Sequence, residues 1–295
     1  MRSQPSLEPP AGGPRPVASW GFAMDAPQPS TPSVALCLGG MDPSGGAGLV
    51  RDVMTLAALG CQPMAVSLAE TLQNGVACTR IEPPSMDPAV RLEHLAPHLV
   101  GRWGVKIGLC ALDDAAFRRL CAILATLAPP VRIWDPILAP TAGVGLHDGR
   151  ALLRMAGALL PMGGWVVGPN REEAAAFAGF SGGDLRTAEP ERLAAPWLEA
   201  GAAAVWLKGG HAEGDRVQDA WITPQGTVTL ESALRLPGAR RGTGCLLAAT
   251  WLGLRLTGAD DQAAALEAAR RLRRQWPHAW APGGAGRPMF APEVP

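Results

Sequence analysis

Short apolar runs alternate with helix-like segments over most of the chain, and this alternation constrains the fold more than any single motif. The apolar runs have the length of buried strands and cover residues 34–38, 64–69, 103–107, 131–134, 165–167 and 203–207. Helical patterns follow most of them, at residues 49–59, 88–100, 114–127, 148–160 and from 171 onward. Such alternation is typical of a mostly parallel sheet with helices on both faces. Because no repeat or linker interrupts residues 33–288, we predict a single α/β domain there.

Further segments complete the predicted domain. Residues 217–223 and 227–230 are expected to form an antiparallel pair around the turn at 224–226. Residues 246–256 are apolar on nearly every face, which predicts a buried helix, and residues 261–275 predict a last helix. In the first helix we expect Arg51, Asp52 and Thr55 to lie on the more polar side. Its inward side chains are expected to be Leu49, Val50, Val53, Met54, Leu56 and Ala57.

The overall charge excludes several classes of partner. Lysine plus arginine equals aspartate plus glutamate at 26 each, so no net field attracts the protein to nucleic acid or to a lipid surface. No apolar run is long enough to span a bilayer. The six cysteines are scattered and lack the spacing of a disulfide framework or a metal site. We therefore expect reduced thiols in a cytoplasmic protein without a nucleic-acid or membrane partner.

Both ends of the chain are expected to lie outside the folded domain. Residues 1–32 are rich in Pro, Ser, Gly and Ala and lack the continuous apolar stretch of a secretory signal, which indicates a disordered leader. Met24 is an alternative start within that leader. Residues 289–295 are expected to form a C-terminal tail.

A glycine-rich tetrapeptide, residues 242–245, stands directly before the predicted buried helix. Gly242, Thr243 and Gly244 leave backbone N–H groups uncovered beside the positive end of the helix dipole, which makes a candidate phosphate site. Cys245 falls in the first turn, where the same field favours a thiolate with a lowered pKa. The alternative interpretation is a glycine-rich helix start that buries a small cysteine, and this stretch alone does not decide between the two.

Polar side chains gather where the predicted strands end. They are Asp42, Gln73, Lys106, Asp135, Asn170 and Lys208. Because the carboxyl ends of parallel strands share one edge of a sheet, where ligands bind, we expect these residues to border one site. The turn at residues 39–48 is rich in glycine, but it has neither the spacing of a dinucleotide fingerprint nor the Gly-Lys-Ser/Thr of a P-loop.

These motifs occur in an order that resembles one family. The chain carries, in turn, Gly-x-Asp-Pro-Ser-Gly-Gly-Ala-Gly, Lys-Ile-Gly, Asp-Pro, Pro-Asn-x-x-Glu, Lys-Gly-Gly-His and Gly-Thr-Gly-Cys. Over about residues 34–288 it resembles the bacterial hydroxymethylpyrimidine/phosphomethylpyrimidine kinases of the ribokinase-like superfamily. The resemblance implies a homodimeric kinase that uses ATP and Mg²⁺ to phosphorylate the small molecule 4-amino-5-hydroxymethyl-2-methylpyrimidine in thiamine biosynthesis.

The resemblance also implies a pyrimidine pocket and its lining. The lining residues would be Gly40, Asp42, Ala47, Gln73, Leu109 and Ile137. The amide of Gln73 would offer a donor and an acceptor to the aminopyrimidine edge. Cys245 faces this pocket in the family, and it would assist removal of the proton from the hydroxymethyl group beside the amides of residues 242–244.

The same resemblance implies which residues contact the nucleotide, at what we call the nucleotide end of the site. Lys208 and Asn170 would contact ATP, with Lys208 neutralising the phosphate chain. Asp135 and Glu173 would hold Mg²⁺ through waters, with Asn170 beside them, since Mg²⁺ keeps much of its hydration. His211 is expected only to form a hydrogen bond within its loop.

Departures from the family pattern leave alternatives open. Arg241 stands where a histidine is usual, residues 140–143 replace the usual segment, and the loop between residues 74 and 80 is shorter. An added phosphate would need further anion contacts, so phosphorylation of the pyrimidine monophosphate is left open. One alternative is a pyridoxal-type kinase, which shares the fold and an aromatic hydroxymethyl substrate. The other is a pyrimidine-binding sensor without turnover. Gln73 favours the pyrimidine, and the retained catalytic candidates argue against the sensor.

Overall fold

The computed structural model describes residues 32–139, 146–180, 187–284 and 286–291. The predicted leader up to residue 31 and the altered segment 140–143 lie outside this part of the chain. From Pro32 onward the chain forms one compact unit around a nine-stranded sheet, with strand order β10-β9-β7-β6-β5-β4-β1-β2-β3. No helix in the described ranges is long and apolar enough to cross a membrane.

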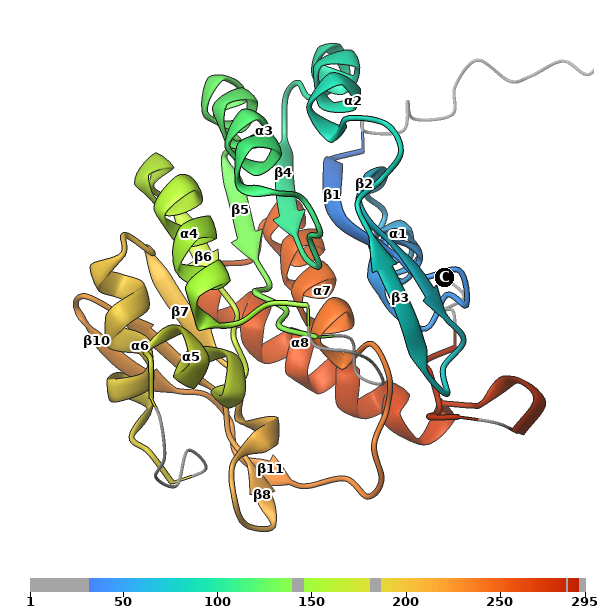
Figure 1. Ribbon diagram of the computed structural model, residues 1–295. Coiled ribbons are helices and arrows are strands. Elements are labelled where there is room, and N and C mark those ends of the chain that lie inside the picture. Colours follow the sequence, from blue (N-terminus) through green and yellow to red (C-terminus); the bar gives the residue numbers. More distant parts are fainter. Residues whose placement is uncertain (1–31, 140–145, 181–186, 285, 292–295) are drawn as a thin grey trace, which may run out of the picture. The chain divides into compact units, whose positions relative to one another are not determined.

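The centre of the sheet is parallel, as predicted (Figure 1). Its parallel strands are β1 (Val34–Met41), β2 (Gln62–Gln73), β4 (Trp103–Ile107), β5 (Val131–Trp134), β6 (Trp165–Val167) and β7 (Ala204–Leu207). Antiparallel strands lie at both edges: β3 (Cys78–Glu82) pairs with β2, while β9 (Ala220–Thr223) pairs with β7 and with β10 (Gly226–Thr229). The predicted α/β class with a mostly parallel sheet is confirmed.

The predicted strand bounds hold best in the middle of the sheet. β4, β5 and β6 have the predicted bounds, because a short, largely buried strand is marked by its apolar run. β1 and β2 extend further than predicted, to Met41 and Gln73. The added half of β2 pairs with β3, which the sequence did not predict. Its residue Leu72 is 64% exposed, so this hairpin lacks the apolar signal of a core strand.

Residues 217–223 do not form the single predicted strand. Val217 belongs to the short strand β8 (Arg216–Val217), which pairs with β11 (Ala233–Leu234) in a separate two-stranded sheet. Asp219 lies between β8 and β9 and is buried, where its carboxylate accepts hydrogen bonds from Gly209 N–H and from the Trp206 indole. The predicted strand is therefore divided at Asp219, whose side chain points into the interior of the protein.

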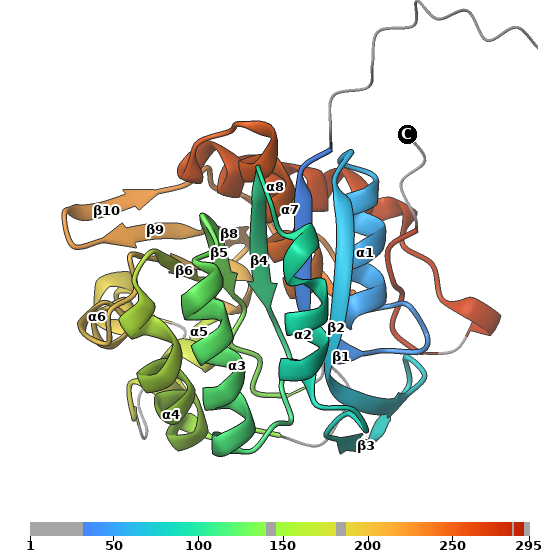
Figure 2. The same cartoon turned by 90° about the horizontal axis from the view of Figure 1, so that it is seen from above.

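Helices cover both faces of the sheet (Figure 2). One face carries α2 (Pro88–Leu95), α3 (Asp114–Leu127), α4 (Gly149–Leu159), α5 (Arg171–Phe177) and α6 (Pro190–Glu199). The other carries α1 (Gly48–Ala57), α7 (Thr243–Thr257) and α8 (Asp261–Gln275). Successive strand residues alternate between the two cores: Leu36 faces the first and Cys37 the second. Short 3₁₀ turns lie at Ala96–His98, Leu160–Met162, Gly209–His211, Trp276–His278 and Pro282–Gly284.

Side-chain caps explain where several helices begin. The cap residues are Asp87, Asp113, Asp148, Asn170 and Asp260, and each accepts a hydrogen bond from a first-turn N–H. α3 and α8 have the predicted bounds. α2 ends at Leu95 rather than near residue 100, because Pro97 has no N–H with which to continue the helix.

The predicted faces of α1 are partly wrong. Arg51, Asp52 and Thr55 are buried, whereas Val53 is only half-buried and Ala57 is exposed. Each buried polar group has a partner: Arg51 donates to Phe290 O, Asp52 pairs with Lys106, and Thr55 donates to Arg51 O. The helix therefore buries a polar face, which apolar periodicity does not predict.

The C-terminal residues 286–290 belong to the folded part, which corrects the predicted tail from residue 289. Phe290 is completely buried, and Met289 pairs with the backbone of Trp280 and Arg241. Arg241 N–H donates to Pro288 O, and Arg287 N–H donates to Gly75 O at the tip of the β2–β3 hairpin. This segment thus fastens the hairpin to the start of α7.

Candidate active site

Nearly all predicted site residues meet in one cavity of about 750 Å³ at the carboxyl ends of the parallel strands. Its lining includes Gly40, Ala47, Gln73, Leu109, Asp135, Ile137, Asn170, Glu173, Lys208, Gly242, Thr243, Gly244 and Cys245. Asp42 is the exception. Gly40 leaves the room that the Leu109 side chain occupies, because a Cβ on Gly40 would lie 2.9 Å from Leu109 Cδ2.

The start of α7 forms one wall of the cavity. Gly242 has a φ of 75°, and a Cβ there would lie 2.1 Å from Gly46 O, so glycine is required. The helix begins at Thr243, and its cap residue makes no side-chain hydrogen bond to it. The first-turn N–H groups are therefore open to an anion in the cavity.

Cys245 lies in this first turn, but the lowered pKa predicted for it is wrong. Burial raises the pKa of the Cys245 thiol to about 11. The Lys106 ammonium and a hydrogen bond from Gly48 N–H offset this rise only in part, and the carboxylates of Asp52 and Asp135 add to it. At neutral pH the side chain is therefore a thiol, because loss of hydration outweighs the field of the helix.

Asp135 and Lys208 form a buried ion pair on the cavity wall. Asp135 follows β5, Lys208 follows β7, and Nζ lies 2.6 Å from Asp135 Oδ1. Burial lowers the pKa of Lys208, but Asp135 and Glu173 raise it by more, so the amine keeps its charge. Gly244 brings the helix start against this pair, since a Cβ there would lie 3.3 Å from Asp135 Oδ2. Phosphate-binding amides and a charged pair thus share one wall.

The donor set at this wall fits a hydrated Mg²⁺. Asp135 Oδ2 is buried and has no hydrogen-bond partner among the described residues. Burial raises the pKa of Glu173 to about 7, with Lys208 lowering it and Asp135 raising it further. All three side chains line the same cavity. Among the residues that the structure describes, no three His, Cys, Asp or Glu side chains form a metal cage. Mg²⁺ needs few carboxylates and keeps its waters, which two separate carboxylates would allow.

Asn170 and His211 behave as local hydrogen-bonding residues in this structure. Asn170 caps α5 in a capping box, in which its Oδ1 accepts from Glu173 N–H and Glu173 Oε2 accepts from Asn170 N–H, both at 2.8 Å. His211 Nδ1 lies 3.2 Å from Glu172 Oε1. The capping box holds the Glu173 carboxylate at the cavity.

A second buried ion pair borders the cavity. Lys106 Nζ lies 2.6 Å from Asp52 Oδ2, and both side chains are 1% exposed. Burial raises the pKa of Asp52 to about 6, although Lys106 lowers it. Asp52 Oδ1 is buried without a hydrogen-bond partner in the described part of the chain. Both members of the pair act on the Cys245 thiol, because Lys106 lowers its pKa and Asp52 raises it.

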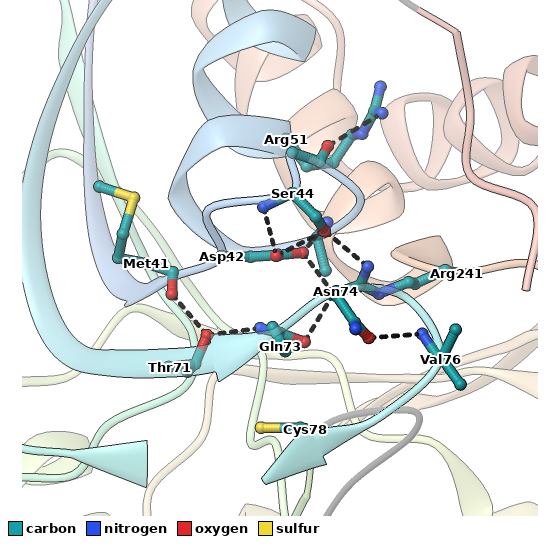
Figure 3. A network of polar contacts seen from close by, with 12 residues as sticks. Met41, Asp42, Ser44, Arg51, Thr71, Gln73, Asn74, Val76, Cys78 and Arg241 are labelled. Carbon is teal, nitrogen blue, oxygen red and sulfur yellow. Dashed lines mark hydrogen bonds and ion pairs between the residues drawn. The ribbon is translucent and has the colours of Figure 1, made fainter. Parts of the chain in front are cut away.

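Asp42 organises a polar network and does not line the cavity, which corrects its predicted place in the pyrimidine lining (Figure 3). Its Oδ1 accepts from the N–H and the hydroxyl of Ser44. Its Oδ2 accepts from Ala47 N–H and, at 2.7 Å, from Arg241 Nη2. These four hydrogen bonds use the acceptor positions of the carboxylate, which is completely buried. Asp42 shapes the glycine-rich turn and holds Arg241.

Arg241 connects this network to Gln73. Its Nη1 donates to Ser44 Oγ and its Nη2 to Gln73 Oε1, each at 2.6 Å. Two glycines make room for the guanidinium: a Cβ on Gly46 or Gly75 would lie 3.0 Å or 3.1 Å from Nη1. Gln73 lines the cavity as predicted, but its amide already has partners in the protein.

Comparisons with known proteins point to one family. The family model described as phosphomethylpyrimidine kinase matches residues 42–289. The hydroxymethylpyrimidine/phosphomethylpyrimidine kinase of Rhizobium meliloti is 31% identical over 231 residues, covering 74% of this chain and 80% of that protein. Its namesake from Synechococcus elongatus is 30% identical over 261 residues, covering 87% and 96%. The chain belongs to the phosphomethylpyrimidine kinase family.

The kinase also shares its fold with a solved structure of a different name. Pyridoxal kinase from Staphylococcus aureus in complex with ADP gives a TM-score of 0.77 at 20% identity, covering 89% of this chain and 94% of that one. At this identity the likeness shows the fold alone. That fold is the ribokinase-like fold implied by the sequence motifs, so this part of the prediction is confirmed.

The sequence did not predict the place of several polar residues at or next to the cavity. Asp52, which lines the cavity, was expected on the polar side of α1. Thr71 lies beside the cavity, where its hydroxyl oxygen accepts a hydrogen bond from Gln73 Nε2, and its segment lacks the apolar pattern that predicts a strand. Arg241 was noticed only as a departure from the family pattern. A charged residue directly before the glycine-rich helix start was the available signal for Arg241, but its partners come from β2 and the turn after β1.

Proposed function

We propose that this kinase transfers the γ-phosphoryl group of ATP to the hydroxymethyl oxygen of 4-amino-5-hydroxymethyl-2-methylpyrimidine, a step of thiamine biosynthesis. The observation that carries the proposal is the single cavity that combines two kinds of lining. The open start of α7 lies against the Asp135–Lys208 pair, which suits a phosphate chain. Leu109, Ile137 and Gln73 line the same cavity and suit a flat ring with a polar edge. The names of the relatives support the pyrimidine.

At the nucleotide end of the cavity, the protein would neutralise the negative charge of the ATP phosphate chain. Lys208 and Asn170 would contact the phosphate chain of ATP, and Asp135 and Glu173 would hold Mg²⁺ through waters. Bound Mg²⁺ would supply positive charge to the phosphate oxygens. The first-turn N–H groups of residues 243–245 would stabilise the charge on the transferred group. Phosphoryl transfer asks a protein mainly for such positioning and neutralisation.

The acceptor end would position the hydroxymethyl group beside Cys245. In the transfer this oxygen forms a bond to phosphorus, the bond between that phosphorus and the ADP oxygen breaks, and the hydroxyl proton leaves. Cys245 would take the proton in its ionised form, which burial makes a minor form at neutral pH. The charged pair of Lys106 and Asp52 lies close enough to influence this ionisation.

Three finer points complete the proposal. The pyrimidine monophosphate is a second acceptor, as the double name of the relatives suggests. The protein is a homodimer, which sedimentation tests, and it is cytoplasmic, which cell fractionation tests. The dimer follows from the resemblance in sequence, and the location follows from the six scattered cysteines, which lack the spacing of a disulfide framework.

An assay of ADP release tests the proposal, with the pyrimidine, its monophosphate and pyridoxal supplied side by side. We expect turnover with the pyrimidine. Greater turnover with pyridoxal would favour the pyridoxal-type kinase, which the shared fold keeps as the second candidate. Binding of the pyrimidine in calorimetry without any ADP release would favour the sensor.

A further inference from the structure

Two neighbours fix the direction of the Gln73 amide (Figure 3). The Arg241 guanidinium only donates, so the Gln73 atom 2.6 Å from its Nη2 must be the carbonyl oxygen. On the other side, the Thr71 hydroxyl lies 2.6 Å from Met41 O, which only accepts, so the hydroxyl hydrogen points there. Thr71 Oγ1 must then accept from Gln73 Nε2, at 2.7 Å. This row of hydrogen bonds has one direction, and turning the amide over would break it at both ends.

Both ends of the row are firmly held. Met41 O belongs to β1, and Thr71 lies on the neighbouring strand β2. The Arg241 side chain is 4% exposed and is bound by Asp42 and Ser44, while its N–H donates to Pro288 O. The row therefore connects the sheet to the start of α7 through one amide.

The fixed amide presents a fixed pattern to the cavity. The second Nε2–H and the second lone pair of Oε1 have no partner among the described residues, and Gln73 lines the cavity. An aminopyrimidine carries an amino donor beside a ring-nitrogen acceptor, which matches one donor and one acceptor in a defined order. Pyridoxal has no amino group beside its ring nitrogen and does not match this pattern.

We propose that Thr71 and Arg241 are positioning residues that make the site selective for an aminopyrimidine ring, by holding the Gln73 amide in one orientation. The inference rests on the proposed function, because it takes Gln73 as the contact to the ring. It goes beyond that function by assigning the selectivity to two residues that act through Gln73.

A double-mutant cycle tests whether Thr71 acts through Gln73. Calorimetry gives the dissociation constant of the hydroxymethyl aminopyrimidine, and the ADP-release assay gives KM and kcat. We expect Thr71→Val to weaken binding by about 3–10-fold, the range for one hydrogen bond, with kcat little changed. Thr71→Ser keeps the hydroxyl and should restore binding. In the Gln73→Leu background, Thr71→Val should have no further effect.

Thr79→Val is the matched control. Thr79 lies on the paired strand β3, is exposed, and donates its hydroxyl to the backbone oxygen of Leu72 rather than to the Gln73 side chain. It should not alter the dissociation constant. Thermal melting of every variant separates loss of folding from loss of binding.

Arg241→Lys tests the other end of the row. A lysine ammonium keeps the charge beside Asp42 but lacks the planar fork that reaches Gln73 as well. We expect the ratio of kcat/KM for the pyrimidine to kcat/KM for pyridoxal to fall. The fall should be larger than in Thr71→Val, because the hydrogen bond from Arg241 fixes which side of the Gln73 amide carries the carbonyl oxygen.

The outcomes separate the inference from the proposed function. If wild-type protein phosphorylates the pyrimidine but Thr71→Val weakens binding equally with and without Gln73, the inference alone is overturned. An unchanged selectivity ratio in Arg241→Lys also overturns it. If wild-type protein neither binds nor phosphorylates the pyrimidine, the proposed function fails and the inference fails with it.

Discussion

The two ends of the cavity differ in how many of their polar groups already have partners within the protein. At the acceptor end, Asp42 accepts four hydrogen bonds and Gln73 is bonded on both sides. At the nucleotide end, Asp135 Oδ2 has no partner among the described residues, and burial raises the pKa of Glu173 to about 7. The polar network at the acceptor end is thus held in place within the protein before a ligand binds, with one donor and one acceptor of Gln73 left over. At the nucleotide end a buried carboxylate oxygen is left without a partner in the described part of the chain.

This difference corresponds to the two ligands that we propose. A neutral ring brings no charge, so it is recognised best by donors and acceptors that are fixed beforehand. A phosphate chain and its cation bring charges of both signs, so an open helix start and an unpartnered carboxylate oxygen can be completed on binding. Changes at the nucleotide end should therefore alter ATP binding and the stability that depends on the buried charges. Changes at the acceptor end should alter the affinity and selectivity for the ring.

The largest expected effect is that of Cys245→Ser, at the boundary between the two ends. A serine hydroxyl is nearly the size of the thiol but does not ionise in the accessible pH range. We expect kcat to fall by about 10²–10⁴-fold, the range for loss of a general base, with pyrimidine binding nearly unchanged. Single-turnover ADP release and calorimetry measure the two quantities. Full activity in this variant would leave the first-turn amides as the catalytic element.

The pH profile sharpens the same prediction. Because burial raises the pKa of Cys245 to about 11, the thiolate is the minor form at neutral pH. Its fraction rises about tenfold for each pH unit below the pKa. We expect kcat of the wild type to rise between pH 7 and 9, and the thiol-dependent part of this rise to be absent in Cys245→Ser. A profile that is the same in both proteins would contradict proton removal by Cys245.

The next largest effect is expected for Lys208→Met at the nucleotide end. The substitution leaves the buried Asp135 carboxylate without its cation, which should lower the free energy of unfolding by about 3–5 kcal/mol. It should also raise the KM for ATP, because the phosphate chain loses a positive charge. Chemical denaturation and initial rates at varied ATP check the two parts.

The matched control is Arg270→Met, which breaks the exposed pair of Arg270 with Glu231. Such surface pairs contribute about 0–1 kcal/mol, so this variant should keep nearly all its stability. An unchanged KM for ATP in Lys208→Met would place the phosphate chain elsewhere in the cavity.

Phe290→Ala tests the support of the acceptor end. Phe290 is completely buried, and its backbone oxygen accepts from Arg51. Removing the ring should lower the free energy of unfolding by about 3–5 kcal/mol, the usual cost for a buried phenylalanine. Denaturation of Phe290→Ala and of Trp280→Ala, whose side chain is 51% exposed, makes the comparison. Equal stability of the two variants would mean that residue 290 is a free tail, as the sequence had suggested.

The sequence predicted those features that depend on local pattern. Apolar runs gave β4, β5 and β6 their bounds, and aspartate and asparagine caps marked the starts of helices such as α3. The meeting of polar residues at the carboxyl edge followed from the topology of a parallel sheet. These predictions succeeded because each depends on neighbouring residues or on one general rule of the fold.

The predictions that failed concern features that depend on contacts between distant segments. Asp52 is buried because Lys106 on β4 meets it, and no periodicity within α1 contains that information. The predicted pKa of Cys245 was wrong because the field of the helix start is the stronger influence only on an exposed thiol, and burial dominates at this buried one. The role of Arg241 depends on Gln73, which is far away in the chain.

The smallest of these effects is expected for Gln73→Leu, which removes the polar edge of the acceptor end. The substitution leaves polar groups of the ring without partners, at a cost of about 1–3 kcal/mol in binding free energy. It also removes an acceptor from Arg241, so a second variant is needed to separate the two causes. Gln73→Glu restores an acceptor for Arg241 but, when ionised, has no N–H to offer the ring or Thr71. If calorimetry shows weak pyrimidine binding in both variants, the lost donor to the ring is the cause. If Gln73→Glu binds as tightly as the wild type, the amide serves only to hold Arg241, and the ring must be recognised by other residues of the cavity.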